Sequence, residues 1–551
     1  LPIPPSPPPP ISPSPHLFIN KEYLKVSKAA RPPLFLTIAA VVVAIAIALP
    51  LFYLVIRAFA AGGEELLQLF TRQQNIIILF NSIVLMIAVA LLSALISIPL
   101  AFLTVRTDLP KRRFWLIVTT LPLAVPSYVG SFALIGAFAP RGSFLQLLLE
   151  PLGVEELPSI YGWFGAIFAL TLFTYPYMLL SLRSALQGLD PSLEEAARSM
   201  GFNSRETFFK IVLPQLYPSL IAGGLLVALY ALRDFGTPSL MQFDAFTQAI
   251  FIQYQASFNR DAAAALSLML VAIVMFILWL ESRMRSRAAY YTRGTASFRR
   301  VKLVKLGAWK LPALAFCGII TFLGVVLPVV TIVFWLIQGF LTEYEFIDLL
   351  EPTLNSITAA GLAAIVTTLF ALPIAILSVR FPSKIIAIVE RSTYICFGVP
   401  GIVVALSLVF FGANYFPLLY QTLPMLIFAY LILFLQQSVG TVRTSLLQVN
   451  PKIEEASRSL GKSSWQTLKQ ITLPLVSPGI LSGTVLVFLT AMKELPATML
   501  LSPIGFDTLA VEIWKATENV DFADAAAASL MILIVSMAST FFVLSQEKGN
   551  R

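Results

Sequence analysis

Long, unbroken runs of apolar residues dominate the pattern of hydrophobic and polar positions along this chain. A helix needs about 20 apolar residues to cross the hydrocarbon core of a bilayer, and runs of that length recur from one end to the other. The runs lie near 34–56, 77–102, 115–138, 161–182, 212–232, 262–280, 311–337, 355–378, 385–411, 423–440, 473–491 and 526–545. The strands of a closed barrel would alternate apolar and polar residues instead. The pattern therefore predicts an all-α polytopic membrane protein with about twelve spans.

The apolar pattern repeats. NSIVLMIAVALLSALISIPLAFLTVR (81–106) matches NSITAAGLAAIVTTLFALPIAILSVR (355–380) at an offset of 274 residues, and farther along the offset is 260. The difference comes from a longer external loop, 139–160, in the first copy. Each copy holds six spans, an even number, so the two copies are expected to insert in the same orientation.

The repeat divides the chain into segments. We predict a proline-rich tail, two six-helix repeats joined by a basic linker, and a short C-terminal tail. The boundaries are 1–33, 34–281, 282–310, 311–545 and 546–551. The first tail has nine prolines in its opening fifteen residues and is expected to be an extended lead-in or a PxxP-type docking site.

Charge sets the predicted orientation. Residues 281–310 carry nine Lys and Arg against one Glu, whereas 342–352 carry four acidic residues and no basic one. Basic loops stay in the cytoplasm, so both termini are predicted to be cytoplasmic. The net charge of +9 then reflects the basic loops that set the orientation in the membrane. No basic face that could bind nucleic acid is evident.

Few residues are available for catalysis or metal binding. Only 12% of the chain is charged, and it contains one histidine, His16, and two cysteines, Cys317 and Cys396, in apolar runs. These cysteines have neither a disulfide framework nor metal-ligand spacing. No nucleophile–base pair or metal-ligand set is evident, which argues against a membrane enzyme.

A charged stretch also occurs twice, at 190–214 and 450–474. In both copies an N-cap and a proline, Asp190-Pro191 or Asn450-Pro451, precede about ten residues that end at Gly201 or Gly461. A second helix is expected at once, with Ser463 as its cap in the second copy. The apolar side of the first helix is Leu193, Ala196, Ala197 and Met200, or Ile453, Ala456, Ser457 and Leu460. Such helices either pack on their own spans or dock in a groove of a partner.

The stretch resembles the signature loop of permease subunits of binding-protein-dependent ABC importers. The pattern E-A-A, three residues, G, nine residues, I-x-L-P recurs, with serine at its third position in the second copy. The resemblance implies two docked ATPase subunits and a periplasmic binding protein. The residues that it assigns to docking are Leu193, Glu195, Ala196, Ala197, Met200, Gly201, Ile453, Glu455, Ala456, Ser457, Leu460 and Gly461.

The chain itself has no GxxxxGK[ST] phosphate loop. ATP and Mg²⁺ are therefore expected on the partner ATPase, and this subunit is expected to bind no cofactor and to be no enzyme. LRDFGTPSLM (232–241) and KELPATMLLSPIGFDTLAVEIW (493–514) further resemble the ferric-iron branch. Permeases for thiamine, polyamines or sulfate and molybdate share the loop and remain alternatives. A secondary transporter, the rival from another class, would have no use for two docking helices.

Charged pairs occur at matching positions where the fifth and eleventh spans end. They are Arg233-Asp234 and Lys493-Glu494, 260 residues apart. Ionisable groups at membrane depth commonly serve a transport path, but opposite charges at the end of a span can also anchor it at the interface. The sequence leaves both interpretations open. The four residues either line the translocation path or form an external gate, or they anchor the ends of the two spans.

Overall fold

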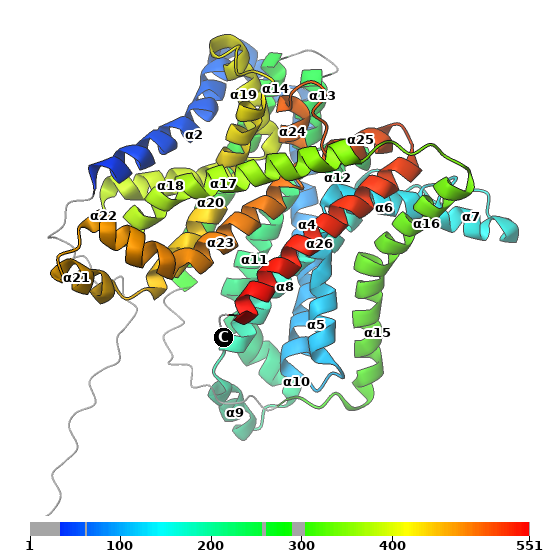
Figure 1. Ribbon diagram of the computed structural model, residues 1–551. Helices are drawn as coiled ribbons and strands as arrows, with labels where there is room; N and C mark the ends of the chain where they lie inside the picture. The colour runs from blue at the N-terminus through cyan, green and yellow to red at the C-terminus, as the bar shows by residue number, and fades with distance from the viewer. Residues whose placement is uncertain (1–32, 61–62, 256–259, 289–302, 550–551) are drawn as a thin grey trace, which may run out of the picture.

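The computed structural model describes residues 33–60, 63–255, 260–288 and 303–549 (Figure 1). Within these ranges the chain is built from helices, and the β-structure consists of one isolated bridge between Thr107 and Val304. The all-α prediction is confirmed. The proline-rich tail and most of the basic linker lie outside the described residues.

Nine helical segments in the described ranges are long and apolar enough to cross a membrane. They correspond to predicted spans one, two, four to eight, ten and eleven. Their helices are α2 (Leu34–Ala60), α4 (Gln73–Arg106), α8 (Trp163–Gly188), α11 (Leu213–Arg233), α14 (Arg260–Ala288), α15 and α16 (Lys310–Thr321, Leu327–Leu341), α17 (Leu350–Arg380), α20 (Leu423–Gln448) and α23 (Leu473–Ala491). The last predicted span is α26 (Phe522–Gly549), a helix with a shorter apolar part, Phe522–Met537.

Two predicted spans are not continuous, which corrects the expectation for 115–138 and 385–411. The first consists of α5 (Arg112–Thr120) with the 3₁₀ turn Leu121–Ala124, followed by α6 (Ser127–Phe138) after a bend of 98°. The second consists of α18 (Lys384–Gly398) and α19 (Gly401–Tyr415), bent by 107°. Pro126 and Pro400 stand at the two breaks, and Val125 and Val399 before them are extended. Proline lacks an N–H and disfavours the helical conformation of the residue before it.

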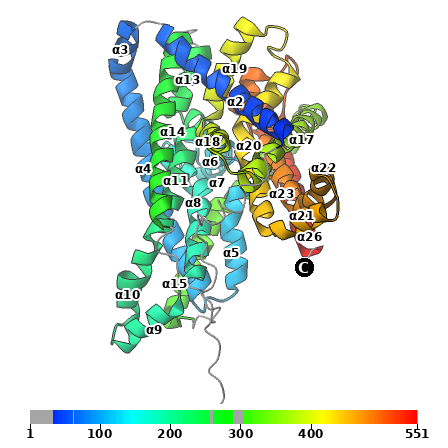
Figure 2. The same cartoon turned by 90° about the vertical axis from the view of Figure 1, so that its left-hand side faces the viewer.

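Each repeat forms a bundle, and its first helices pack both on their own repeat, α2 on α14 and α16 on α26, and on the other repeat. In the first repeat α4, α8 and α11 pack together, and their equivalents α17, α20 and α23 do so in the second. However, α2 packs on α17, α18 and α19 of the second repeat, while α15 and α16 pack on α5 and α6 of the first (Figures 1 and 2). The two repeats are therefore interlocked rather than merely adjacent.

The described end of the linker is attached to the first repeat. Val304 N–H donates to Arg106 O at 2.9 Å, and Asp108 N–H donates to Val304 O at 3.1 Å. Asp108 also accepts the Leu306 N–H at 2.8 Å and pairs with Lys310 at 3.1 Å. The helix before the linker, α14, continues to Ala288, and α26 continues through Gly549. Helix thus extends beyond the boundaries predicted at 281 and 545.

Replacing Asp108 by asparagine should loosen this attachment. The Leu306 N–H, and then Lys310, hold the pKa of Asp108 below its ordinary value. A carboxyl group with a lowered pKa stabilises the folded state above its unfolded pKa and loses that effect as pH falls through its folded pKa. We expect faster hydrogen exchange at 303–310 in Asp108→Asn than in the wild type. In the wild type, exchange at 303–310 should also become faster when the pH falls below the pKa of Asp108 in the folded protein, after correction for intrinsic exchange rates. Unchanged exchange, equal to that of an Asp348→Asn control in the loop between α16 and α17, would contradict the attachment.

Candidate functional site

The two charged stretches fold as short capped helices, as predicted. They are α9 (Pro191–Ser199) and α21 (Pro451–Ser459), and their N-cap side chains, Asp190 and Asn450, accept the N–H groups of Ser192 and Lys452 at 2.9 and 3.0 Å. Gly201 and Gly461 follow with φ of +91° and +88°. This left-handed conformation is costly for residues with a Cβ, so glycine ends both helices cleanly.

A second turn of helix leads from each stretch into the membrane. It is α10 (Ser204–Thr207) or α22 (Ser464–Thr467), and in both copies the cap and the third residue exchange hydrogen bonds, Asn203 with Glu206 and Ser463 with Gln466. A π-helical turn, 208–212 or 468–472, then joins it to α11 or α23. The local structure is therefore duplicated along with the sequence.

Ten of the twelve predicted docking residues are exposed on these stretches, and two are not. Large apolar side chains protrude at both ends of each helix, with exposed fractions of 49% and 68% for Leu193 and Met200, and 45% and 84% for Ile453 and Leu460. Glu195, Ala196, Gly201, Glu455, Ala456 and Gly461 are also exposed. Ala197 and Ser457 are buried, and the Ser457 hydroxyl is 3.0 Å from the hydroxyl of Thr467 in the following helix. Position three of the motif is therefore buried within the chain in both copies, and in the second copy it faces the following helix.

A buried ion pair ties each short helix to a long one. Arg106, the last residue of α4, lies 3.3 Å from Glu194, and Arg380, the last residue of α17, lies 3.0 Å from Glu454. The arginines also donate to the carbonyl groups of Leu186 and Val449. We call these ion pairs the Arg–Glu struts. Their residues recur at the same offsets as the repeat, 274 for the arginines and 260 for the glutamates, but their contact appears only in the fold.

The second strut has more bonds than the first. Arg380 Nε lies 3.1 Å from both carboxylate oxygens of Glu454, and Thr472 donates to one of them at 3.1 Å. The first copy has Val212 at the position of Thr472, and valine cannot donate a hydrogen bond. The two short helices, α9 and α21, are therefore attached through different numbers of bonds. We call them the predicted docking helices.

The two charged pairs lie at the bends of the broken spans. Asp234 accepts bonds from Ser127, the first residue of α6, and from the Thr237 N–H at 2.8 Å. Glu494 lies so close to Gly401, the first residue of α19, that a side chain there would collide with its carboxylate. Carboxylates are favoured at helix N-termini, where backbone N–H groups lack partners. Each acidic residue therefore lies at the start of a half-helix of its own repeat. The backbone N–H groups that donate to it, those of Thr237 and Ala497, belong to the short helices that follow, α12 (Gly236–Leu240) and α24 (Pro496–Leu501).

The basic residues reach the opposite repeat instead. Lys493 donates to the carbonyl of Ala124 at 2.5 Å, and the Arg233 guanidinium lies 5.0 Å from the centre of the Phe397 ring. Glu494 is near enough to Arg233 and Asp234 to interact with them electrostatically. The structure thus brings all four predicted residues to the boundary between the repeats, where each is partly exposed. We call this group the central charged layer.

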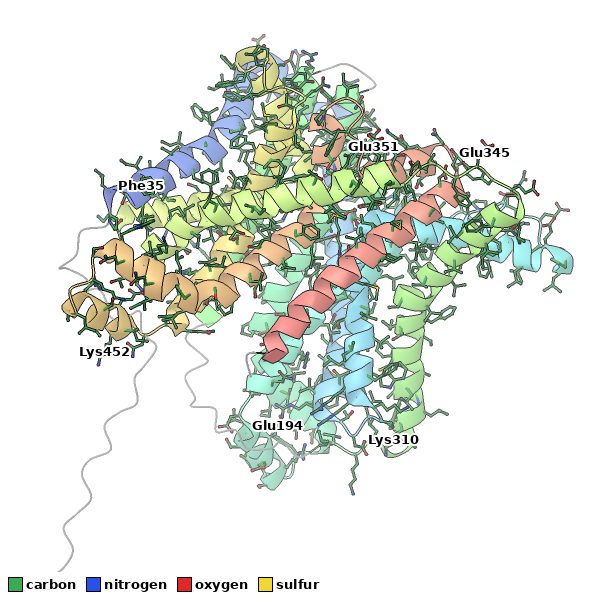
Figure 3. The ribbon with its side chains drawn as sticks, in the orientation of Figure 1. Phe35, Glu194, Lys310, Glu345, Glu351 and Lys452 are labelled. Atoms are coloured by element: carbon green, nitrogen blue, oxygen red, sulfur yellow. The ribbon has the colours of Figure 1, made fainter. Side chains whose placement is uncertain are left out.

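The predicted docking helices, α9 and α21, and the acidic loop 342–352 lie at different ends of the bundles. Figure 3 shows Glu194 and Lys452 at the ends of the two bundles, away from Glu345 and Glu351. Among the described residues, no three His, Cys, Asp or Glu side chains gather as a metal-binding group.

Comparisons with known proteins agree with this arrangement. The sequence profile of the family "Binding-protein-dependent transport system inner membrane component" matches twice, over residues 105–289 and 368–547, which confirms the duplication. An Fe(3+)-transport system permease protein of Haemophilus influenzae is 33% identical over 93% of this chain and 98% of its own length. A ferric transport system permease protein of Actinobacillus pleuropneumoniae is 26% identical over 87% and 72%. A molybdenum transport system permease protein of Escherichia coli is 29% identical over 38% and 96%.

Proposed function

Because the chain belongs to the binding-protein-dependent transport system inner membrane components and is a permease subunit of an ABC importer, we propose that its cargo is ferric iron. The observation that supports this cargo is the likeness to an Fe(3+)-transport permease over almost the full length of both chains. The molybdenum relative matches only 38% of this chain. Hard Fe³⁺ prefers oxygen ligands, so the scarcity of histidine and cysteine is compatible with it.

We further propose that each docking helix binds one copy of a separate ATPase, which holds ATP and Mg²⁺. The support is the pair of exposed apolar side chains at the ends of each helix, Leu193 with Met200 and Ile453 with Leu460. Exposed large apolar groups on a capped helix are typical of helix-in-groove recognition. The docking helices and both termini then face the cytoplasm, and a periplasmic binding protein delivers the cargo to the opposite side.

Transport follows from the attachment of the docking helices. When nucleotide draws the two ATPase copies together, α9 and α21 approach each other, and the Arg–Glu struts pass this movement to α4 and α17. The central charged layer, which contains contacts between the repeats, is then rearranged. This gives alternating access to the two sides of the membrane.

Uptake by cells that lack this chain tests the cargo. We expect ferric iron uptake to fall to background and growth to slow under iron limitation, with thiamine, sulfate and molybdate uptake unchanged. Radioactive uptake assays on the deletion strain, with and without the restored gene, measure this. A defect in thiamine uptake with normal ferric iron uptake would overturn the assignment and leave the family and the fold unaffected.

A further inference from the structure

Positively charged side chains from two distant segments meet where α5 and α15 begin. The isolated bridge between Thr107 and Val304 and the ion pair of Lys310 with Asp108, at 3.1 Å, hold the two segments together, and α15 packs on α5. Five exposed cations lie on these segments, and we call them the basic patch. They are Lys111, Arg112, Arg113, Lys305 and Lys310.

The basic patch lies at the depth of the lipid headgroups. The apolar span that contains α15 starts at Gly307, and the broken span that contains α5 starts at Arg112. Trp309 and Phe114, beside these cations, are 65% and 53% exposed. Aromatic side chains at the ends of membrane spans typically lie at the boundary between lipid and water. The cations of the patch are therefore within reach of phosphate groups on the membrane surface.

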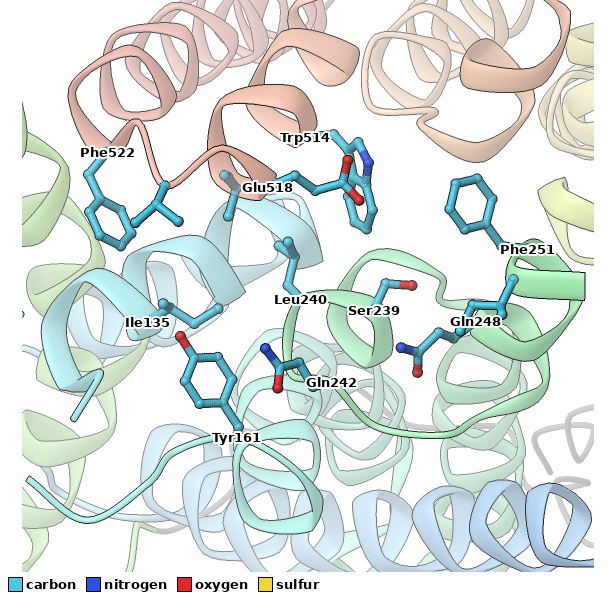
Figure 4. A pocket seen from close by; sticks show the side chains of 13 residues that line it. Ile135, Tyr161, Ser239, Leu240, Gln242, Gln248, Phe251, Trp514, Glu518 and Phe522 are labelled. Atoms are coloured by element: carbon cyan, nitrogen blue, oxygen red, sulfur yellow. The ribbon is translucent and has the colours of Figure 1, made fainter. Parts of the chain in front are cut away.

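The opposite end of the bundles has a different character. Figure 3 shows Lys310 at the end of the first bundle that carries Glu194 of α9. At the other end, where Tyr161 precedes α8, a cavity of about 350 Å³ opens between the repeats. Figure 4 shows Glu518 on its wall, and its described lining residues include no Lys or Arg. A negatively charged headgroup therefore finds its complement in the basic patch, at the end that carries α9.

The local structure does not account for the cations of the patch. Positive side chains at the start of a helix oppose its dipole, so α5 gains no stability from them. The turn after α17 in the second repeat is Phe-Pro-Ser-Lys, with Lys384 as its single cation, whereas the first repeat has Lys-Arg-Arg at 111–113. Within the described residues, Lys310 has an ion-pair partner and the other four cations of the patch have none. Four positive charges are therefore available to an external anion.

We propose that the basic patch binds the phosphate groups of anionic phospholipids in the adjoining membrane leaflet. Clusters of about four to eight Lys and Arg next to a membrane span are typical of surfaces that bind anionic lipids. Lipid phosphates also relieve the repulsion between the cations of the two segments, which share this small surface. Bound lipid therefore holds residues 303–310 against α5.

This attachment reaches the first Arg–Glu strut. The Val304 N–H donates to the backbone oxygen of Arg106 at 2.9 Å, and the Arg106 side chain pairs with Glu194 of α9. The strut of the first repeat has fewer bonds than that of the second. Anionic lipid thus supports the end of α4 at the strut that has less support of its own.

Native mass spectrometry tests binding on the full chain, solubilised in detergent and titrated with phosphatidylglycerol or with zwitterionic phosphatidylcholine. It counts the lipids that each protein molecule retains and gives their affinity. One cation near a charged lipid surface contributes about fivefold in affinity. We therefore expect phosphatidylglycerol to bind at least fivefold more tightly than phosphatidylcholine, and the double variant Arg112→Gln, Arg113→Gln to lose most of this preference.

A matched double variant controls for the loss of charge as such. Lys384→Gln combined with Arg391→Gln removes two exposed cations from α18 of the second repeat and should leave the preference for phosphatidylglycerol unchanged. Arg112→Lys combined with Arg113→Lys keeps the charge, should keep the preference, and provides a second measurement if the glutamine variant folds poorly. A glutamine or lysine variant of α5 that contradicts these results, with the α18 variant equal to the wild type, would overturn the proposal.

Hydrogen exchange tests the effect on the strut. In nanodiscs of equal parts phosphatidylglycerol and phosphatidylcholine, we expect exchange at 303–310 and 190–201 to be at least threefold slower than in phosphatidylcholine alone. The double variant Arg112→Gln, Arg113→Gln should exchange equally in both lipids. Equal exchange of the wild type in both lipids would show that lipid does not support the strut.

An acidic surface of the ATPase is the rival occupant of the patch. If the double variant Arg112→Gln, Arg113→Gln lost ATPase binding but kept its preference for phosphatidylglycerol, the patch would be a protein contact and the lipid proposal would be wrong. Lipid binding is measured without ATPase or cargo, so its failure leaves the proposed function standing. Normal ferric iron uptake in the deletion strain would refute the cargo and leave the lipid site standing.

Discussion

Replacing Arg380 by methionine is expected to reduce transport by one to two orders of magnitude while the protein still inserts in the membrane. The change leaves Glu454, which is 8% exposed, without its cation. Removing one partner of a buried ion pair typically costs about 3–5 kcal/mol. Because the strut joins α21 to α17, we expect the ATPase to remain bound and to hydrolyse ATP without driving uptake. Uptake, ATP hydrolysis and protein abundance, measured in the same membranes, check this result.

Two comparisons identify the strut as the cause. Arg391→Met removes an exposed arginine from α18, in the same repeat, and should leave transport unchanged. Arg380→Met combined with Glu454→Gln should recover part of the activity, because the unpaired carboxylate is then gone. Wild-type uptake per molecule in Arg380→Met would show that the strut does not transmit movement.

The unequal bonding of the two struts gives an order of severity. Arg106 holds Glu194 through one contact at 3.3 Å, whereas Arg380 and Thr472 hold Glu454 through several. Arg106→Met should therefore impair coupling less than Arg380→Met.

Replacing Lys493 by methionine is expected to impair transport per molecule, whereas Asp234→Ala should chiefly lower abundance. Lys493 bonds to a carbonyl of the other repeat, so its loss weakens a contact between the moving parts. Asp234 bonds within its own repeat, and its loss leaves Ser127 and the Thr237 N–H unpaired at about 1–3 kcal/mol each. Uptake divided by abundance separates the two effects, with at least a tenfold loss expected for Lys493→Met.

The control for Lys493 is another lysine of the second repeat. Lys515 pairs with Asp507 at 2.7 Å and is about half exposed, so Lys515→Met should change uptake little. Asp234→Ala could instead impair uptake per molecule at normal abundance, and Lys493→Met could lower abundance with normal uptake per molecule. That result would show that the roles assigned to the acidic and basic residues are wrong.

Local features of the docking stretches were readable from the sequence because neighbours in the chain produce them. Asp190 and Asn450 cap helices that begin one residue later, and the glycines at 201 and 461 end them with positive φ. The direction of Ala197 and Ser457 was not readable, since which side of a short helix is buried depends on the helix that follows it.

The sequence by itself determined the spans, the duplication and the capped docking stretches, since these depend on apolar length, internal similarity and contacts between near neighbours. Only the tertiary structure decided where spans break and which charges meet. Pro99, Pro176 and Pro373 lie inside continuous helices, yet Pro126 and Pro400 mark bends. At these two bends a carboxylate about a hundred residues away, Asp234 or Glu494, lies at the new helix start. The start of a helix is a favourable place for a carboxylate, and these two carboxylates reach it only when distant parts of the chain have packed together.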